Sequence, residues 1–354
     1  MYGKIIKDLA PTAENQRNSE GSFIDLKNGD ILFVYSRYGS YCADDNSPAD
    51  LYACLSHDNG ETFGEPYPLI SCNDIPNATN IMSVTLRHMK NGDIGLFFLA
   101  KTGDTICLPY IIRSSDDGKS WSAPLCCCDR DGYFVVNNDR IELTSSGRLV
   151  VPCALHSTET GLGKGVLYIY ASDDDGYSWK LIHSGTSLPN CSGCHTGVQE
   201  PGILQLNDGR LWCYIRNDSG RQYECFSIDD GETWTTPLPS AFTSAISPMS
   251  TKRLSDGRII AIWNPIPIYN GRSELADGVW IGARTPLVFA LSSDDGKTFS
   301  SPRPIETDEK SGFCYVAIHE TSDSLLLGYC AGGVQDRSTL HRLRIRKIPL
   351  SEIK

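Results

Sequence analysis

Short apolar stretches alternate with polar turns along the whole chain, and no long helical period interrupts them. Six of these turns share one form, in which a polar residue and usually a glycine stand between alternating apolar positions. They are LKNGDIL around Gly29, MKNGDIG around Gly92, TSSGRLV around Gly147, LNDGRLW around Gly209, LSDGRII around Gly257 and the degenerate TSDSLLL around Ser324. This form is typical of a tight β-hairpin. The pattern predicts an all-β protein of short strands.

A second repeat, Ser-x-Asp-x-Gly-x-Thr/Ser-aromatic, alternates with the hairpins. It runs over residues 56–63, 114–121, 172–179, 227–234 and 292–299, and successive copies start 58, 58, 55 and 65 residues apart. Asp and Gly favour a turn with positive φ, and the hydroxyls and the carboxylate can bond the turn amides. The closing aromatic side chain is expected to pack between sheets. We therefore interpret this box as structural and assign none of its aspartates to catalysis.

The two repeats together predict the architecture. Units of this length with four short strands each are typical of propeller blades. We expect a six-bladed β-propeller of four-stranded blades with five Asp boxes, formed by residues 1–354 as a single domain. The sixth hairpin has no box after it. The segments KIIKDL near the start and RLRIRKIPL near the end are expected to complete the last blade together and close the ring.

Composition and charge exclude several classes of partner. The formal net charge of −11 repels phosphate backbones, so a nucleic-acid partner is not expected. No apolar run approaches the roughly 18 residues of a membrane span. The first residues do not resemble a secretory signal, which predicts a cytoplasmic protein whose 14 cysteines are reduced thiols. With no metal-ligand run and no Gly-rich phosphate loop, we expect neither a metal nor another cofactor.

Five Asp boxes on six hairpins resemble the sialidase (neuraminidase) superfamily, in a divergent branch of Asp-box (BNR) repeat proteins. The resemblance covers essentially the whole chain and implies a glycan-handling site on one face of the propeller. Retaining members of that family grip the substrate carboxylate with three arginines and use a loop aspartate as acid/base. Their nucleophile is a tyrosine assisted by a glutamate, which suits an anomeric carbon that already bears a carboxylate.

Three segments match the family's site. GFCYVAIHETSDSLLLGYC is similar to the stretch with the nucleophile, which makes Tyr315 the candidate. QEPGILQLNDGRLWCYIRND resembles the stretch with the assisting glutamate and a following arginine, which are here Glu200 and Arg216. ARTPLVFALSSDDGKTF resembles the stretch with another arginine of the clamp, which is here Arg284. Arginine suits this role because its planar fork can bind a carboxylate with two hydrogen bonds.

The segment SRYGSYCADDNSPADLYACLSHDNG resembles the family's loop that holds the acid/base. Asp45 is the best match, with Asp44 and Asp50 as alternatives. Such an acid would protonate the leaving oxygen and then take a proton from water. Arg37 stands where the family has an arginine near the site, and we expect it to orient that carboxylate.

The first arginine of the clamp is where the sequence departs from the family. Sialidases usually carry it in an Arg-Ile-Pro motif, and this chain reads QRNSEGSFIDLKNGD at that place. Either Arg17 completes the clamp, or Glu20 occupies its position. In the first case a 2-keto acid sugar such as sialic acid remains a plausible substrate, and in the second a carboxylate would be repelled.

Two further segments are unusually polar for inner strands. They are NNDRIEL, with Asn138 and Arg140, and GRQYECF, with Gln222 and Tyr223. These side chains are either substrate-recognition candidates or hydrogen-bonded polar groups of the core.

The resemblance thus implies an exo-acting, retaining glycoside hydrolase that cleaves a terminal sugar from a small glycan or glycoside. Two other hypotheses stay open. One is a carbohydrate-binding propeller without chemistry. The other is a hydrolase or lyase that acts on a non-sialic sugar, which the altered first-arginine motif favours.

Overall fold

The computed structural model describes residues 2–40, 44–158, 161–189 and 193–354, and its regular structure is almost entirely β. The helical segments of this part of the chain are three-residue 3-10 turns: η1 (Cys72–Asp74), η2 (Ile268–Asn270), η3 (Val334–Asp336) and η4 (Leu350–Glu352). No helix among the described residues is long and apolar enough to cross a membrane. The all-β prediction is confirmed.

Most strands form antiparallel sheets of four or five strands. One contains β1 (Lys4–Leu9), β27 (Leu343–Pro349), β26 (Ser324–Cys330) and β25 (Cys314–Glu320). A second contains β10 (Phe134–Val135), β11 (Glu142–Leu143), β12 (Leu149–Thr158), β13 (Gly161–Ser172) and β14 (Lys180–Thr186). A third contains β15 (Gln199–Gln205), β16 (Leu211–Arg216), β17 (Arg221–Ser227) and β18 (Leu238–Thr243). A fourth contains β19 (Ser250–Arg253), β20 (Ile259–Trp263), β23 (Leu287–Ser292) and β24 (Arg303–Glu306).

Apart from a two-stranded sheet of β21 (Leu275–Ala276) and β22 (Val279–Trp280), one sheet remains, and it differs from the six separate four-stranded sheets that the sequence predicts. It has eight strands, namely β2 (Asn18–Asp25), β3 (Ile31–Tyr38), β4 (Ala49–Ser56), β5 (Tyr67–Ile70), β6 (Asn80–His88), β7 (Ile94–Lys101), β8 (Cys107–Ser114) and β9 (Leu125–Cys126). Four separate sheets of blade size therefore accompany one larger sheet. The reason is a single parallel pair, Ala49 with Asn80, which joins β4 to β6. On either side of this pair the strands are antiparallel.

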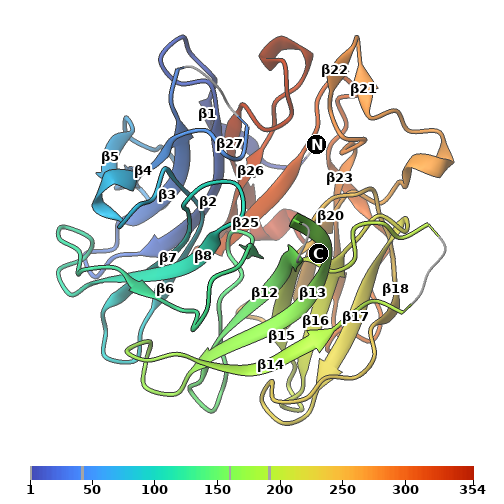
Figure 1. Cartoon of the computed structure of the whole chain (residues 1–354). Coiled ribbons are helices and arrows are strands. Elements are labelled where there is room, and N and C mark those ends of the chain that lie inside the picture. Colours follow the sequence, from blue (N-terminus) through green and yellow to red (C-terminus); the bar gives the residue numbers. More distant parts are fainter. Residues whose placement is uncertain (1, 41–43, 159–160, 190–192) are drawn as a thin grey trace.

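The sheets are arranged like the blades of a propeller, and Figure 1 shows them following one another round a common centre in sequence order. Strands of successive sets touch near the centre: β2 contacts β6 and β25, and β15 contacts β12 and β19. Apolar clusters fill the spaces between sheets, for example Val150 and Ile169 against Ile203. Burial of these apolar faces, worth about 25 cal/mol per Å², is the main force that holds neighbouring sheets together.

The two ends of the chain share one sheet, as the sequence predicts. β1 pairs with β27 from Lys4 opposite Lys347 to Leu9 opposite Leu343. The cluster with Phe23 and Phe33 packs this sheet against β2 and β3. The arrangement thereby closes on itself.

The repeated box forms the same hydrogen-bonded turn wherever it occurs. In the turn after β17, Ser227 Oγ donates to Asp229 and accepts from the Gly231 amide, and Asp229 accepts from the amide and hydroxyl of Thr233. The residue after the aspartate has a positive φ, 57° for Asp230. Asp and Asn tolerate this left-handed conformation better than most residues.

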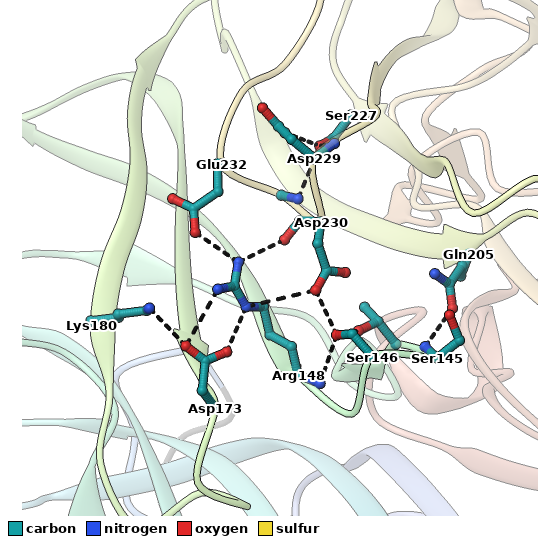
Figure 2. A network of polar contacts seen from close by, with 12 residues as sticks. Ser145, Ser146, Arg148, Asp173, Lys180, Gln205, Ser227, Asp229, Asp230 and Glu232 are labelled. Carbon is teal, nitrogen blue, oxygen red and sulfur yellow. Dashed lines mark hydrogen bonds and ion pairs between the residues drawn. The ribbon is translucent and has the colours of Figure 1, made fainter.

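That left-handed residue also connects neighbouring sheets. Asp230 accepts a hydrogen bond of 2.6 Å from Ser146, which lies in the hairpin that precedes β12. Figure 2 shows Arg148 of the same hairpin between Asp173 and Glu232, at 2.7 and 2.8 Å. The Arg148 side chain is only 14% exposed, so this ion network is partly shielded from water. It joins the box turns after β13 and β17 to one hairpin.

We expect Arg148→Ala to lower the free energy of unfolding by about 1–3 kcal/mol, because it removes a largely buried guanidinium that bonds Asp173, Glu232 and the Asp230 carbonyl. Arg210 is the matched control, since it follows the glycine of the next hairpin and bonds Asp208 of its own turn. Arg210→Ala should change the free energy by less than about 0.5 kcal/mol. Urea unfolding of both variants measures the difference, and equal losses would contradict the role given to Arg148.

Candidate functional site

Four of the strands that face the centre carry a β-bulge at the same place. In β2 the pairing steps from Ser19 opposite Ser36 to Ser22 opposite Val34, which inserts one extra residue. β6, β15 and β25 show the same shift. In each bulge, the residue directly after the last paired residue has a positive φ. These residues are Glu20 (55°), Ser83 (60°), Glu200 (43°) and Tyr315 (59°). Bulges redirect side chains, and strained backbone of this kind concentrates at functional sites.

These four residues occupy one position of the repeat. Each stands nine residues before the hairpin glycine of its own sheet, or before Ser324 in the last repeat. In the third repeat the same position is Asn138, whose Nδ2 donates to the carbonyls of Gly21 and Tyr315 at 2.8 and 3.2 Å. The bulges of β2 and β25 share this donor and therefore lie side by side.

A cavity of about 380 Å³ lies where the bulges meet. It brings together six of the residues that the sequence singles out: Glu20, Asp45, Glu200, Arg216, Arg284 and Tyr315. They come from β2, β15, β16, β25 and two connecting segments, so the cavity gathers residues that are nearly 300 positions apart.

Tyr315 and Glu200 form a hydrogen-bonded pair in this cavity. The Tyr315 hydroxyl donates to Glu200 Oε1 at 3.0 Å. Arg216 Nη1 lies 3.3 Å from the same hydroxyl and 2.7 Å from Glu200 Oε2. Burial raises the pKa of Tyr315 well above its ordinary value, the Glu200 charge adds to the rise, and Arg216 and Arg284 oppose it. Tyr315 is thus a neutral phenol whose proton already points at a carboxylate.

Arg284 lies beside this pair. Its guanidinium is 5.3 Å from the centre of the Tyr315 ring and 5.0 Å from that of Trp280, and Nη1 donates to Cys314 Sγ at 3.0 Å. Burial opposes ionisation of Cys314, but Cys330 and Arg284 outweigh it and lower the pKa of the thiol. Among the described residues, Arg284 Nε has no hydrogen-bond partner.

Asp45 lies at the rim, where its side chain is 59% exposed. Arg17 Nη1 is 2.6 Å from Asp45 Oδ1, and Lys101 Nζ donates to the Asp45 carbonyl at 2.6 Å. Desolvation by the surrounding protein opposes ionisation, but the charges of Arg17 and Lys101 outweigh it, so the pKa of Asp45 falls below its ordinary value. The free protein therefore holds this carboxyl ionised.

The two alternatives to Asp45 have structural partners. Asp44 accepts from the Asn46 amide and the Ser47 hydroxyl in its own turn. Asp50 accepts from Ser71 and from the Cys72 amide at the start of η1. Neither residue lines the cavity, because each carboxylate is turned toward a local backbone turn.

Glu20, and not Arg17, faces the cavity from β2. Glu20 is 3% exposed, accepts from Ser83 Oγ at 2.8 Å and lies 3.6 Å from Arg17. Burial raises its pKa from 4.5 to about 7, with a contribution from Asp45, although Arg17 and Ser83 act in the opposite direction. Arg17 is 1% exposed, lies behind Glu20 and Asp45, and does not line the cavity.

Five more candidate residues lie outside the cavity lining: Arg37, Asn138, Arg140, Gln222 and Tyr223. The Arg37 guanidinium stacks 4.4 Å from the ring centre of Tyr52 on the neighbouring strand. Tyr223 belongs to the apolar cluster between β12 and β15. These side chains are occupied by packing against neighbouring strands.

Arg140 and Gln222 are hydrogen-bonded groups of the core. Arg140 donates to the Tyr214 hydroxyl at 2.8 Å and to the Met249 carbonyl at 2.6 Å. Gln222 donates to the Ser247 carbonyl at 2.8 Å. These hydrogen bonds join successive sheets. Of the two alternatives, Arg140 and Gln222 are therefore hydrogen-bonded polar groups of the core.

Several polar or aromatic residues of the cavity were missed: Ser83, Lys101, Asn137, His156, Gln199 and Trp280. The nine-residue offset from Gly92 identifies Ser83 in hindsight. Trp280 lies on the hairpin of β21 (Leu275–Ala276) and β22 (Val279–Trp280), an insertion that explains the longest box spacing, 65 residues. Lys101 ends the apolar strand β7 and carries no comparable signal.

Glu20 makes stability depend on pH. Its pKa is about 7 in the folded protein, against an ordinary value of 4.5, so the folded state binds the proton more tightly. The stabilisation is complete below pH 4.5 and is lost as pH rises through 7, up to about 3 kcal/mol. Glu20→Gln should remove this loss. We expect the wild type to lose unfolding free energy relative to Glu20→Gln between pH 5 and about 8.

Denaturant unfolding at several pH values measures this effect. Glu274→Gln is the control, because Glu274 is exposed and should keep the wild-type profile. Parallel profiles for the wild type and Glu20→Gln would contradict the raised pKa.

Comparison with known proteins places this geometry in a family. Residues 77–328 match the family described as the BNR repeat-like domain. The anhydrosialidase of Macrobdella decora is 27% identical over 226 residues, which are 59% of this chain and 27% of that protein. The sialidase of Bacteroides fragilis (strain YCH46) is 30% identical over 130 residues, 35% of this chain and 22% of that protein. The chain matches about a quarter of the length of these relatives.

Solved structures agree on the fold. A protein of unknown function from Dyadobacter fermentans DSM 18053 has a TM-score of 0.73 at 18% identity, covering 98% of this chain and 99% of that one. The leech intramolecular trans-sialidase complexed with 2,7-anhydro-Neu5Ac has a TM-score of 0.72 at 18% identity, covering 99% and 71%. The intramolecular trans-sialidase from Ruminococcus gnavus has a TM-score of 0.72 at 15% identity, covering 95% of both chains. With its repeats, its fold and this family match, the chain belongs to the BNR repeat-like domain family and is a sialidase-like BNR-repeat protein.

Proposed function

We propose that this protein is a retaining, exo-acting glycoside hydrolase with Tyr315 as nucleophile and Glu200 as its base. The observation that carries the proposal is the 3.0 Å hydrogen bond from the Tyr315 hydroxyl to Glu200, made inside a cavity by two residues in left-handed backbone. A phenol is a weak nucleophile until a base takes its proton, and this pair meets that need. The sialidase-like fold supports the same reaction class.

In the first step, the Tyr315 oxygen bonds to the anomeric carbon while its proton passes to Glu200. The bond from that carbon to the leaving oxygen breaks, and the leaving oxygen takes a proton from Asp45, which enters this step in its protonated form. In the second step, Asp45 takes a proton from water, the water oxygen bonds to the anomeric carbon, and Tyr315 leaves with the proton held by Glu200. Two displacements at one carbon retain the configuration.

The charged neighbours fit this sequence. Arg216 lies against both the phenol oxygen and Glu200, so it stabilises negative charge as the proton moves from one to the other. The charges of Arg17 and Lys101 favour ionised Asp45, which is the form that accepts a proton from water in the second step. Asp45 therefore has to take up a proton from solvent before it acts as the acid of the first step. Arg284 lines the cavity with its guanidinium beside the Tyr315 ring, where it can bind an oxygen of the sugar.

We also infer that residues 1–354 form one domain with six blades and five Asp boxes. Within the eight-stranded sheet, β2 to β5 and β6 to β9 are separate antiparallel sets joined by one parallel pair. Counting these sets as two blades brings the total to six. An apolar cluster packs the two sets face to face, as between the other sheets.

Tyr315→Phe should abolish turnover of aryl glycosides, by about a thousandfold or more, because the nucleophilic oxygen is lost. The test panel contains the aryl α-glycoside of N-acetylneuraminic acid and matched glycosides of uncharged and uronic acid sugars. Tyr177→Phe is the control, since Tyr177 is exposed on a box turn and should stay active. Full activity of Tyr315→Phe would exclude the nucleophile, and no cleavage of any glycoside by the wild type would favour a binding propeller.

Asp45→Asn should slow cleavage according to the leaving group. Loss of a general acid costs about 10²–10⁴-fold when the leaving oxygen needs a proton. We therefore expect a large fall in kcat/KM for an alkyl glycoside and a small fall for the 4-nitrophenyl glycoside of the same sugar. Equal losses for both would assign Asp45 to binding. Asp50→Asn is the matched control, because it changes a carboxylate of the same segment that lies outside the cavity.

A further inference from the structure

The position of Glu20 bears on which sugar the cavity accepts. Glu20 occupies the bulge of β2, and the bulge of β25 beside it holds Tyr315. Asn138 donates to the carbonyls of Gly21 and Tyr315, which places the two bulges side by side, and both Glu20 and Tyr315 line the cavity. A group attached to the anomeric carbon above Tyr315 therefore lies between Glu20 and the arginines.

The cavity is lined by as many acidic as basic side chains among the described residues. The described charged residues that line it are Lys101, Arg216 and Arg284 against Glu20, Asp45 and Glu200. Arg216 is already paired with Glu200 at 2.7 Å, and Arg17 behind the wall is engaged by Asp45 at 2.6 Å. A further carboxylate here would lose its hydration and be repelled by the Glu20 carboxylate. The attraction of the Arg284 guanidinium does not offset this free-energy cost.

A hydroxyl group can both donate and accept a hydrogen bond in this cavity. It can donate to the Glu20 carboxylate, whereas a carboxylate can only accept. It can also accept from Arg284 Nε or Asn137 Nδ2, which are buried at the cavity and have no partner among the described residues. The lining of the cavity thus includes an acceptor, Glu20, and two residues with a donor atom that has no partner among the described residues.

We propose that Glu20 contacts the substrate and selects a terminal sugar with a neutral, hydroxyl-bearing group beside the anomeric carbon, in place of an ionised carboxylate. This inference rests on the proposed function, because it takes the anomeric carbon to lie above Tyr315. It makes Glu20 a specificity-determining residue of the cavity.

The test compares two ligands that differ in one group. They are the methyl α-thioglycoside of N-acetylneuraminic acid, which resists hydrolysis, and the same compound with the C1 carboxylate reduced to a hydroxymethyl group. Calorimetry at pH 8, where Glu20 is mostly ionised, measures both affinities. We expect the wild type to bind the alcohol at least about tenfold more tightly than the acid. Glu20→Gln should reduce that preference to within about threefold, mainly by gaining affinity for the acid.

Glu224→Gln is the matched control, because Glu224 is a partly buried glutamate that bonds Trp212 outside the cavity. It should keep the wild-type preference. If the wild type binds the acid as tightly as the alcohol or more tightly, or binds neither, the proposal is wrong. The wild-type ratio decides this even if Glu20→Gln does not fold.

Turnover separates this proposal from the proposed hydrolase. Preference for the alcohol together with no cleavage of any aryl glycoside would refute the hydrolase and leave the selectivity of Glu20 standing. Cleavage that depends on Tyr315, together with preference for the acid, would support the hydrolase and refute the selectivity of Glu20.

Discussion

The bulge in the inner strands is the constraint on which the site depends. A regular strand points alternate side chains to opposite faces, toward the neighbouring sheets. One extra residue in left-handed conformation turns a side chain toward the centre of the ring. Because four repeats carry this bulge at one offset, Glu20, Ser83, Glu200 and Tyr315 converge although they are distant in sequence. Each such conformation costs about 1–3 kcal/mol, which the packed sheets around it must offset.

The periphery holds the sheets in the positions that this convergence needs. The box turns carry many of the acidic residues of the chain, and their carboxylates are used within the turn or against the next hairpin, as around Arg148. The aspartates of the boxes therefore contribute to stability, and the acidic groups of the cavity come from other segments. This division between a structural rim and a chemical centre follows from the repeat itself.

The three carboxylates of the cavity have different surroundings. Asp45 lies against Arg17 and Lys101, which keep it ionised. Glu20 is buried beside Asp45, and its pKa rises to about 7. Glu200 is paired with Arg216 and accepts the proton of Tyr315 in a hydrogen bond. One cavity therefore contains an ionised group at its rim, a proton acceptor next to a phenol and a carboxyl that titrates near neutrality.

The sequence by itself determined the repeat and the all-β fold, because hairpins and box turns are local and depend on residues close in the chain. It also determined the pairing of the terminal strands, because the last repeat is incomplete without them. It also indicated Tyr315, Glu200, Arg216, Arg284 and Asp45, which the cavity brings together. Only the tertiary structure decided between Arg17 and Glu20, since a bulge shifts which side chain faces the centre. It alone showed that Arg140 and Gln222 bond neighbouring sheets and that Ala49 and Asn80 join two sets of strands. These outcomes depend on partners from other repeats, and no local pattern specifies which distant groups a buried side chain will meet.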